Sequence, residues 1–237
     1  MRIQREMSVI QLTFLPRLFP VNCYLVEEED GLTLIDTALP YSAKGILKAA
    51  KQMGKSILRI CLTHAHSDHV GSLDTLKKAL PHAPVYISHR EARLLSGDRT
   101  LDEDEPKTPI QGGFTTLTTT PDILLQEGTR IGSLLAIATP GHTPGSMAFI
   151  DTRNDAMIVG DAFHTRGGMA VSGTLRPLFP FPALATWNKE KAVESARHIR
   201  ECTPSLLASG HGQMLKQPLV AIDHAISQAT AHLPFTY

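Results

Sequence analysis

The sequence between positions 64 and 69 holds four side chains that can bind metal ions: His64, His66, Asp68 and His69. Imidazole and carboxylate groups together suit zinc, manganese or iron. A helix turns residues the same way only at spacings of three and four, so we expect a tight loop here rather than a helix. Three histidines and an aspartate this close together have no ordinary role in a core, which favours a metal site.

Three more candidate ligands, His142, Asp161 and His211, follow short apolar runs and stand next to glycines. The ends of several strands can bring side chains to one point, and glycine lets backbone pass close by. We therefore predict that all seven candidates meet. One ion would take the first ligand group, which is His64, His66 and His142. A second ion would take the second ligand group, which is Asp68, His69 and His211, and the two oxygens of Asp161 would bridge the ions.

Such a pair of ions predicts hydrolytic chemistry. Two ions about 3.5–4 Å apart can share a water molecule and lower its pKa from 15.7 toward about 7. The metal-bridging hydroxide would attack the substrate, while the ions polarise its carbonyl and stabilise the developing oxyanion. No serine or cysteine nucleophile is needed. We expect two Zn²⁺ ions, with Fe or Mn as the alternatives.

Short apolar runs predict the strands that position these residues, and the Glu29-Asp30-Gly31 turn predicts a hairpin between two of them. The predicted strands span 9–14, 22–28, 32–36, 57–62, 85–88, 134–138, 147–151, 156–159 and 206–208. The predicted helices span 42–53, 70–80, part of 185–202, and 218–233. The candidate ligands come where strands end.

Two segments, 96–121 and 164–184, carry no periodic pattern. Long irregular stretches in a compact domain are usually functional loops or disorder. The second segment mixes Phe and Pro with several glycines, a composition that favours a lid over the site. His164 at its start is a candidate catalytic residue, as a proton donor or a hydrogen-bond partner of the substrate; the alternative is a loop histidine that contacts the lid. Phe19, Phe181, Tyr24 and Trp187 are candidates for either a pocket wall or the core.

Composition argues against several other functions. The chain has 237 residues with 23 Lys plus Arg and 23 Asp plus Glu. With no net charge, it has no overall electrostatic field that would attract nucleic acid or an anionic membrane. No apolar window is long enough to predict a membrane-spanning helix, and the first residues lack a signal-peptide pattern. Three cysteines without a C-x-x-C pair argue against a disulfide framework. A cytoplasmic location is therefore predicted.

The same motifs give the sequence its resemblance to the metallo-β-lactamase fold superfamily. The matching segments are THAHSDHVG at 63–71, PGHTPGS at 140–146, GDAF at 160–163, SGHG at 209–212 and LIDTAL at 34–39. They span nearly the whole chain. The H-x-H-x-D-H motif with the three later ligands is highly specific for the superfamily and poorly specific for substrate.

The resemblance implies an α/β fold in which residues 1–237 form one domain. That fold is a four-layer αβ/βα sandwich with two mixed β-sheets and the metals at one edge. Asp36 would support the metal loop rather than bind metal. Asp161 stands where lactam-cleaving enzymes of this fold have a Cys ligand, so a true β-lactamase is disfavoured. The pattern is closer to the glyoxalase II and homoserine-lactone lactonase branches, although little sequence follows His211 and His164 replaces the lactonase Tyr.

These observations predict a binuclear metallohydrolase that cleaves a small ester, thioester or lactone, with Asp68 and His164 as catalytic residues. One alternative is an iron-dependent oxidoreductase resembling the persulfide dioxygenases of the same fold, which the full ligand set disfavours. Another is a binding module without catalysis, which the same ligand set also disfavours. The predicted partner is a small-molecule substrate, with no nucleic acid and no membrane, and a homodimer is left open.

Overall fold

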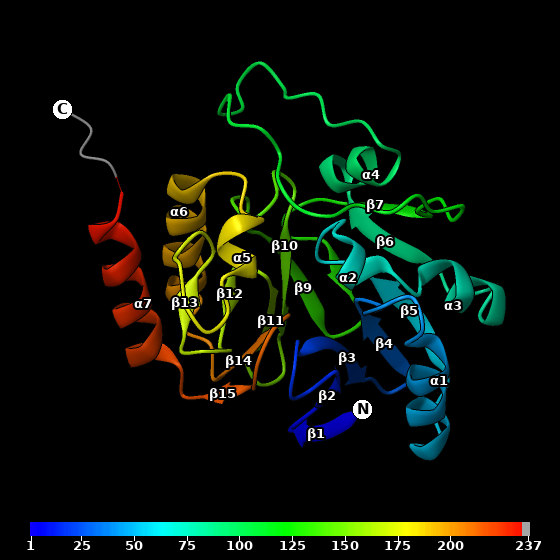
Figure 1. Cartoon of the computed structure of the whole chain (residues 1–237). Helices are drawn as coiled ribbons and strands as arrows, with labels where there is room; N and C mark the ends of the chain where they lie inside the picture. Colours follow the sequence, from blue (N-terminus) through cyan, green and yellow to red (C-terminus); the bar gives the residue numbers. More distant parts are fainter. Residues whose placement is uncertain (234–237) are drawn as a thin grey trace.

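Two β-sheets packed face to face form the centre of the molecule, and helices cover both outer faces (Figure 1). The computed structural model describes residues 1–233. The first sheet has the order β1-β2-β3-β4-β5-β6-β7, with strands β1 (Arg2–Glu6), β2 (Val9–Phe14), β3 (Val21–Glu27), β4 (Leu32–Ile35), β5 (Ile57–Cys61), β6 (Val85–Ser88) and β7 (Ile123–Leu125). The second has the order β15-β14-β11-β10-β9-β8, with strands β8 (Arg130–Ile131), β9 (Leu134–Ala138), β10 (Met147–Asp151), β11 (Ala156–Gly160), β14 (Leu206–Ser209) and β15 (Leu215–Lys216).

Both sheets are mixed because hairpins and helical crossovers alternate along the chain. The predicted hairpin joins β3 and β4 in antiparallel register, with Glu27 opposite Leu32. Strands β4, β5, β6 and β7 then run parallel. Helices make these crossovers: α1 (Ala43–Gln52), the pair α2 (Ser67–Val70) and α3 (Leu73–Ala79), and α4 (His89–Leu95). In the second sheet β11 and β14 are parallel, and α6 (Lys189–Glu201) lies between them in sequence.

Apolar side chains fill three layers, which explains why most strands are buried on both faces. The middle layer lies between the sheets and includes Tyr24 and Phe149. One outer layer packs the first sheet against α1 and α3, around Ile46. The other packs the second sheet against α6 and α7 (Leu219–Ala231), around Ala196 and Ile222. The predicted four-layer sandwich of two mixed sheets is confirmed.

One predicted helix was wrong in its extent. Most of the predicted helix 70–80 forms α3, which starts only at Leu73, and α2 covers residues 67–69, where the sequence predicted a loop rather than a helix; Gly71 and Ser72 separate the two helices. The Gly71 amide donates to the carbonyl of Ala38 at 2.9 Å, and the Ser72 hydroxyl donates to the carbonyl of Leu39. These contacts with a distant loop compete with the helical hydrogen bonds, so the helix begins again only at Leu73.

The segment 164–184 is more ordered than its composition predicts. It contains the second strand of a small hairpin, β12 (Phe163–His164) with β13 (Ala170–Val171), and the short helix α5 (Phe181–Leu184). Segment 96–121 lacks helices and strands, as its composition predicts. Residues 234–237, which the single-domain prediction includes, lie outside the described residues. None of the helices within 1–233 has both the length and the apolar character that crossing a bilayer requires.

Replacing Phe149 with Ala should lower the free energy of unfolding by about 3–5 kcal/mol, because the ring is fully buried between the two sheets and would leave a cavity. Denaturant melts measure this loss. Val220→Ala is the control, because Val220 is 81% exposed on α7 and should change stability little. A loss for Phe149→Ala as small as that of the control would contradict close packing between the sheets.

Candidate metal centre

The seven predicted ligands gather at one edge of the sandwich, and both sheets contribute to them. The loop 62–66 leaves β5 in the first sheet and runs into α2, which carries Asp68 and His69. His142 follows β9, Asp161 follows β11, and His211 follows β14 in the second sheet. Strands β11 and β14 are parallel neighbours, so their carboxyl ends deliver Asp161 and His211 to the same edge.

The donor atoms form three overlapping groups; two are the ligand groups that the sequence predicts, and the third joins His64 and His69 with Asp161. Within the first ligand group, and likewise within the second, the donor atoms lie within 4.8 Å of one another. Asp161 lies between the groups: its Oδ1 is 3.4 Å from His69 Nε2, and its Oδ2 is 3.5 Å from His142 Nε2 and 3.1 Å from His211 Nε2. This arrangement allows Asp161 to bridge two ions, and metal binding by these residues stays a prediction.

Four of the five imidazoles are oriented by a hydrogen bond at Nδ1, which leaves Nε2 directed at the centre. The four Nδ1 contacts are His64 to Thr63 Oγ1 (3.0 Å), His69 to Asp36 Oδ2 (2.7 Å), His142 to Thr186 Oγ1 (3.2 Å) and His211 to the carbonyl of Pro20 (2.7 Å). Histidines that bind metal usually donate their other ring N–H in this way, which sets the tautomer and the ring orientation.

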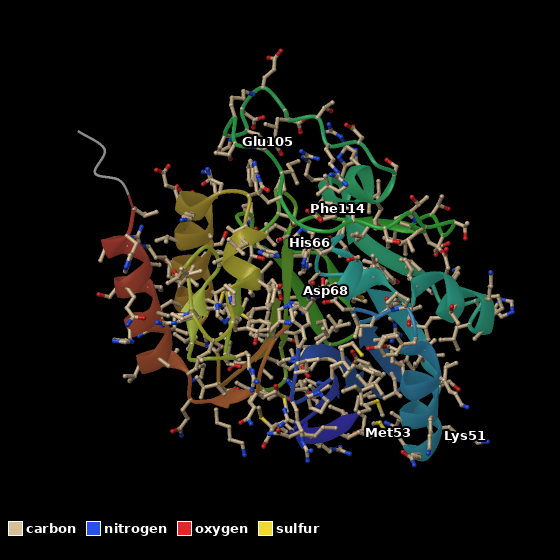
Figure 2. All side chains as sticks on the ribbon, viewed as in Figure 1. Lys51, Met53, His66, Asp68, Glu105 and Phe114 are labelled. Carbon is tan, nitrogen blue, oxygen red and sulfur yellow. The ribbon has the colours of Figure 1, made fainter. Side chains whose placement is uncertain are left out.

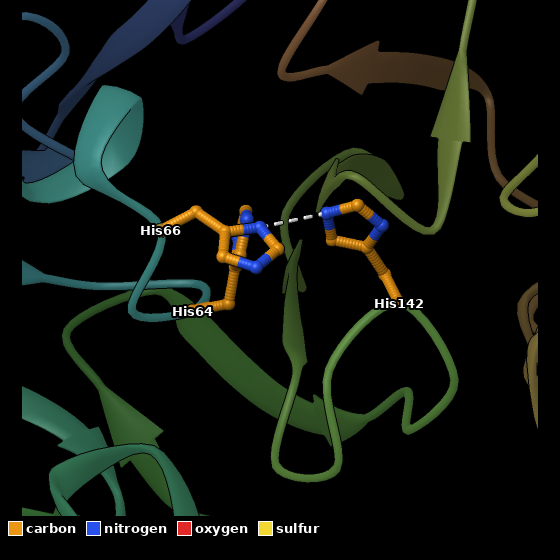
Figure 3. Close-up of side chains that lie close together, drawn as sticks. All are labelled: His64, His66 and His142. Carbon is orange, nitrogen blue, oxygen red and sulfur yellow. Dashed lines mark hydrogen bonds between the residues drawn. The ribbon is translucent and has the colours of Figure 1, made fainter. Parts of the chain in front are cut away.

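His66 is turned the other way round. Its Nε2 lies 3.0 Å from the carbonyl of Gln111, and its Nδ1 lies 3.0 Å from His142 Nε2. Figure 3 shows the rings of His64, His66 and His142 drawn together, with the His66–His142 contact dashed. Since a carbonyl only accepts hydrogen bonds, Nε2 carries the proton, and Nδ1 is the atom that His66 offers to a cation.

Three buried polar atoms at the centre suit a cation. His64 Nε2, His69 Nε2 and Asp161 Oδ1 are buried and have no hydrogen-bond partner among residues 1–233. Leaving a buried polar atom without a partner costs about 1–3 kcal/mol, and a bound metal ion removes that cost. The donor set of imidazoles and carboxylates therefore fits the predicted metal ions.

The electrostatics of the centre differ between its two halves. Burial, followed by neighbouring imidazoles, lowers the pKa of His64 well below its usual value, and burial does the same for His142. These two rings are neutral and ready to coordinate. Burial also acts to lower the pKa of His69 and of His211, but neighbouring carboxylates raise both, Asp161 with Asp36 at His69 and Asp161 with Asp68 at His211. Metal binding on that side must displace protons.

Asp36 supports the metal loop, as the resemblance implies. Its Oδ1 accepts the Thr63 amide at 2.8 Å, and its Oδ2 accepts both the Thr63 hydroxyl at 2.8 Å and His69 Nδ1 at 2.7 Å. These three contacts of its carboxylate hold the loop or orient a predicted ligand, and Asp36 appears in none of the groups of candidate metal donors within the described chain.

Glu91 is a residue of the site that sequence reasoning missed. Its side chain is fully buried at the start of α4. One carboxylate oxygen accepts the amide of Ala65, between two predicted ligands, and the other accepts the amide of Gly145, in the loop that carries His142, each at 2.8 Å. Burial raises the pKa of Glu91 to about 7, while these two amides act in the opposite direction. A single glutamate shortly after a predicted strand gives no sequence signal that separates a buried carboxylate from an exposed one.

The irregular segment 96–121 also belongs to the site. The Ser67 amide donates to the carbonyl of Gly113 at 2.9 Å, and the Phe114 ring packs on His66 with centroids 5.0 Å apart. Trp187 Nε1 donates to the carbonyl of Thr108 at 2.9 Å and anchors the segment from the other side. Figure 2 shows Phe114 above His66 and Asp68, below the outer part of the loop with Glu105.

A cavity of about 430 Å³ opens beside the predicted ligands. Asp68 lines it with a side chain that is 25% exposed, and Asp68 Oδ2 lies 3.4 Å from His211 Nε2. Phe19 and Phe181 also line it. Tyr24, the third aromatic candidate, is instead buried between the sheets, where its hydroxyl donates to the carbonyl of Ser209. The end of the predicted lid, from Phe181 onward, therefore reaches the cavity.

His164 does not line this cavity. Its ring is buried, packs against Phe179 with centroids 5.9 Å apart, and is absent from the cavity lining. Nδ1 lies 3.1 Å from the carbonyl of Arg166, and burial lowers the pKa of His164 to about 4. A neutral ring with its proton on Nδ1 has a lone pair at Nε2, so it is poorly suited to donate a proton. These contacts support the packing alternative, and a catalytic role stays a prediction.

Gly210→Ala should weaken metal binding without unfolding the protein. A Cβ at this position would overlap Asp161 Oδ1 and lie 2.5 Å from His69 Cε1, so both side chains must shift. We expect the metal-free variant to melt close to the wild type, and added zinc to raise its melting temperature less. Thermal melts with and without zinc measure both effects, and an equal rise in the two proteins would contradict this crowding.

Glu91→Gln should lower the free energy of unfolding by about 1–3 kcal/mol and weaken metal retention. Glutamine has one acceptor oxygen, so its NH₂ group must face one of the two buried amides that Glu91 accepts. Denaturant melts and metal content after dialysis are the measurements. Glu194→Gln, at an exposed position on α6, is the matched control; equal behaviour of the two variants would rule out a role for Glu91 in holding the loops.

Several known proteins are similar to this chain in sequence. The uncharacterized protein YobT of Bacillus subtilis is 59% identical over 230 residues, which cover 97% of this chain and 99% of YobT. The probable metallo-hydrolase YflN of the same organism is 30% identical, over 81% of this chain and 80% of YflN. A hydroxyacylglutathione hydrolase of Gloeobacter violaceus is 27% identical over 66% of this chain and 55% of that relative.

A solved structure, that of TTHA1623 in a di-iron-bound form, is also similar. It matches with a TM-score of 0.63 and 28% identity, and the match covers 89% of this chain and 96% of that one. The family model described as the metallo-beta-lactamase superfamily matches residues 16–211, a range that contains all seven predicted ligands. The chain belongs to the metallo-β-lactamase superfamily.

Proposed function

We propose that this protein is a binuclear metal-dependent hydrolase that cleaves a small ester, thioester or lactone. The observation that carries the proposal is that three overlapping three-donor groups join all seven predicted ligands, with Asp161 close to histidines of both ligand groups. Seven donors exceed what one tetrahedral ion uses. The relatives named as a probable metallo-hydrolase and a hydroxyacylglutathione hydrolase support hydrolysis of an acyl compound.

In the proposed reaction, water adds to the acyl carbon, the C–O or C–S bond breaks, and the departing oxygen or sulfur takes a proton. Bound metal ions lower the pKa of water and polarise the carbonyl. Hydrogen bonds at the ring nitrogens hold the three histidines of the first ligand group in place, so they need little reorganisation. Asp68 is the partly exposed carboxylate on the cavity wall, and we propose that it both binds metal and accepts the proton from water.

A second candidate is iron chemistry at the same centre, which the di-iron form of TTHA1623 favours. We propose two Zn²⁺ as the native pair, with Fe or Mn as alternatives, because imidazole and carboxylate ligands accept all three. Redox-active iron in protein purified without added metal would support the oxidoreductase. The small-molecule substrate, the exclusion of nucleic acid and membrane, the cytoplasmic location and the homodimer that was left open stay predictions.

Protein purified without chelator should contain close to two metal ions per chain, and Asp68→Ala should lose most hydrolytic activity and one ion. The variant removes a donor of the second ligand group while the first group keeps its hydrogen bonds. Elemental analysis and turnover of a panel of esters, thioesters and lactones measure both quantities.

His198→Ala is the control for these measurements, because His198 is exposed on α6 and lies outside the candidate groups. It should keep both ions and full activity. A firm stoichiometry of one ion per chain, unchanged by added zinc, would show that the centre is not binuclear. Wild-type turnover by Asp68→Ala would show that Asp68 is not catalytic.

A further inference from the structure

The cavity beside the predicted ligands has an apolar wall made by side chains of two segments. Phe19 comes from the loop after β2, and Phe181, Pro182 and Leu184 come from α5. Phe181 is 53% exposed and Leu184 is 68% exposed. Large apolar side chains that gather in solvent around a cavity mark a binding surface, so this wall is a candidate for contact with the substrate.

The wall is continuous with the predicted metal centre. The Phe19 ring lies 5.1 Å from the rings of both Phe179 and Phe181, and 5.3 Å from the ring of His211. Phe179 is buried beneath them, which gives the wall a fixed support. The wall therefore begins beside His211 and continues through Phe19 to Phe181.

The wall offers no partner for a negatively charged substrate group. Among the described residues that line the cavity there is no lysine or arginine. The Arg166 guanidinium donates to the carbonyl of Arg17 at 3.0 Å, and that of Arg99 stacks on Phe114 at 4.4 Å. A carboxylate on the substrate chain would lose hydration against this wall without gaining an ion pair.

We propose that the substrate of this site carries an uncharged apolar acyl chain, aliphatic or aromatic, which binds along Phe19, Phe181 and Leu184. The proposal rests on the proposed hydrolase function and specifies its substrate class. It disfavours acyl compounds whose acyl part bears a carboxylate. Each methylene that the wall covers removes apolar surface from water and should improve binding about two- to fourfold.

Binding of alkyl hydroxamates tests the wall without requiring turnover. Acetohydroxamate, butyrohydroxamate, hexanohydroxamate and octanohydroxamate share one metal-chelating head group and differ only in chain length. Calorimetric titration of the zinc-loaded protein should show affinity rising about two- to fourfold per methylene. An affinity independent of chain length would overturn the proposal.

Substitutions in the wall should weaken the dependence of affinity on hydroxamate chain length. Phe181→Ala and Leu184→Ser remove apolar surface at partly exposed positions, so the fold should tolerate them, and acetohydroxamate should bind as it does to the wild type. Val220→Ala removes a comparably exposed apolar side chain on α7, away from the cavity, and should leave the whole series unchanged. An unaltered dependence on chain length in both wall variants would also overturn the proposal.

Turnover separates this proposal from the proposed function. A hexanoyl thioester should be cleaved at least tenfold more efficiently, in kcat/KM, than its counterpart with a terminal carboxylate, and Leu184→Lys should narrow that ratio. If hydroxamates show the chain-length dependence but no ester, thioester or lactone is cleaved, the hydrolase function fails and the apolar site stands. If cleavage occurs with equal efficiency on charged and uncharged chains, the hydrolase function stands and the apolar substrate class fails.

Discussion

The buried carboxylate of Asp36 determines how the metal loop leaves the first sheet. It accepts the amide and the hydroxyl of Thr63 and the Nδ1 proton of His69, and the same Thr63 hydroxyl contacts His64. Asp36 itself has a φ of 60°, a left-handed conformation that costs about 1–2 kcal/mol for a non-glycine residue. The hydrogen bonds stabilise this strained turn, and two predicted ligands take their orientation from it.

The second sheet must then be aligned with the first, because its strands supply the remaining ligands. Asn22 on β3 donates its side-chain amide to the carbonyls of Ser209 and Gly212, on either side of His211. Tyr24 on the same strand donates its hydroxyl to Ser209. These buried hydrogen bonds cross the sandwich where the two sheet edges meet. The relative position of the two ligand groups is therefore a property of the sheet packing rather than of either loop alone.

The predicted metal donors and the cavity lining come from different parts of the fold. Strand ends hold the donors, whereas the segment around Gln111 and the helix α5 shape the cavity above them. Loops on a rigid scaffold can change with little effect on the core. The donors belong to the superfamily scaffold, whereas Phe181 and Leu184, at the two ends of α5, line the cavity.

The sequence alone determined the features that depend on local pattern. Apolar runs of the right length predicted most strands, and histidine or aspartate beside glycine at the ends of those runs predicted which side chains would gather at one edge. The grouping of His64, His66 and His142 was likewise predictable, because two of them share a short loop. The helix break at Gly71 was not, since it arises from hydrogen bonds to residues 38 and 39, which lie far away in sequence.

Other features of the site depend on contacts between segments that are far apart in sequence. Glu91 is buried because α4 packs against two loops, and the carbonyl of Gln111 determines which ring nitrogen of His66 faces the centre. His164 was a candidate for the cavity, but the packing of Phe179 places its ring behind the wall. Residue type and spacing show which groups can do chemistry, whereas burial and hydrogen-bond partners across the chain decide which atom of each group faces the site.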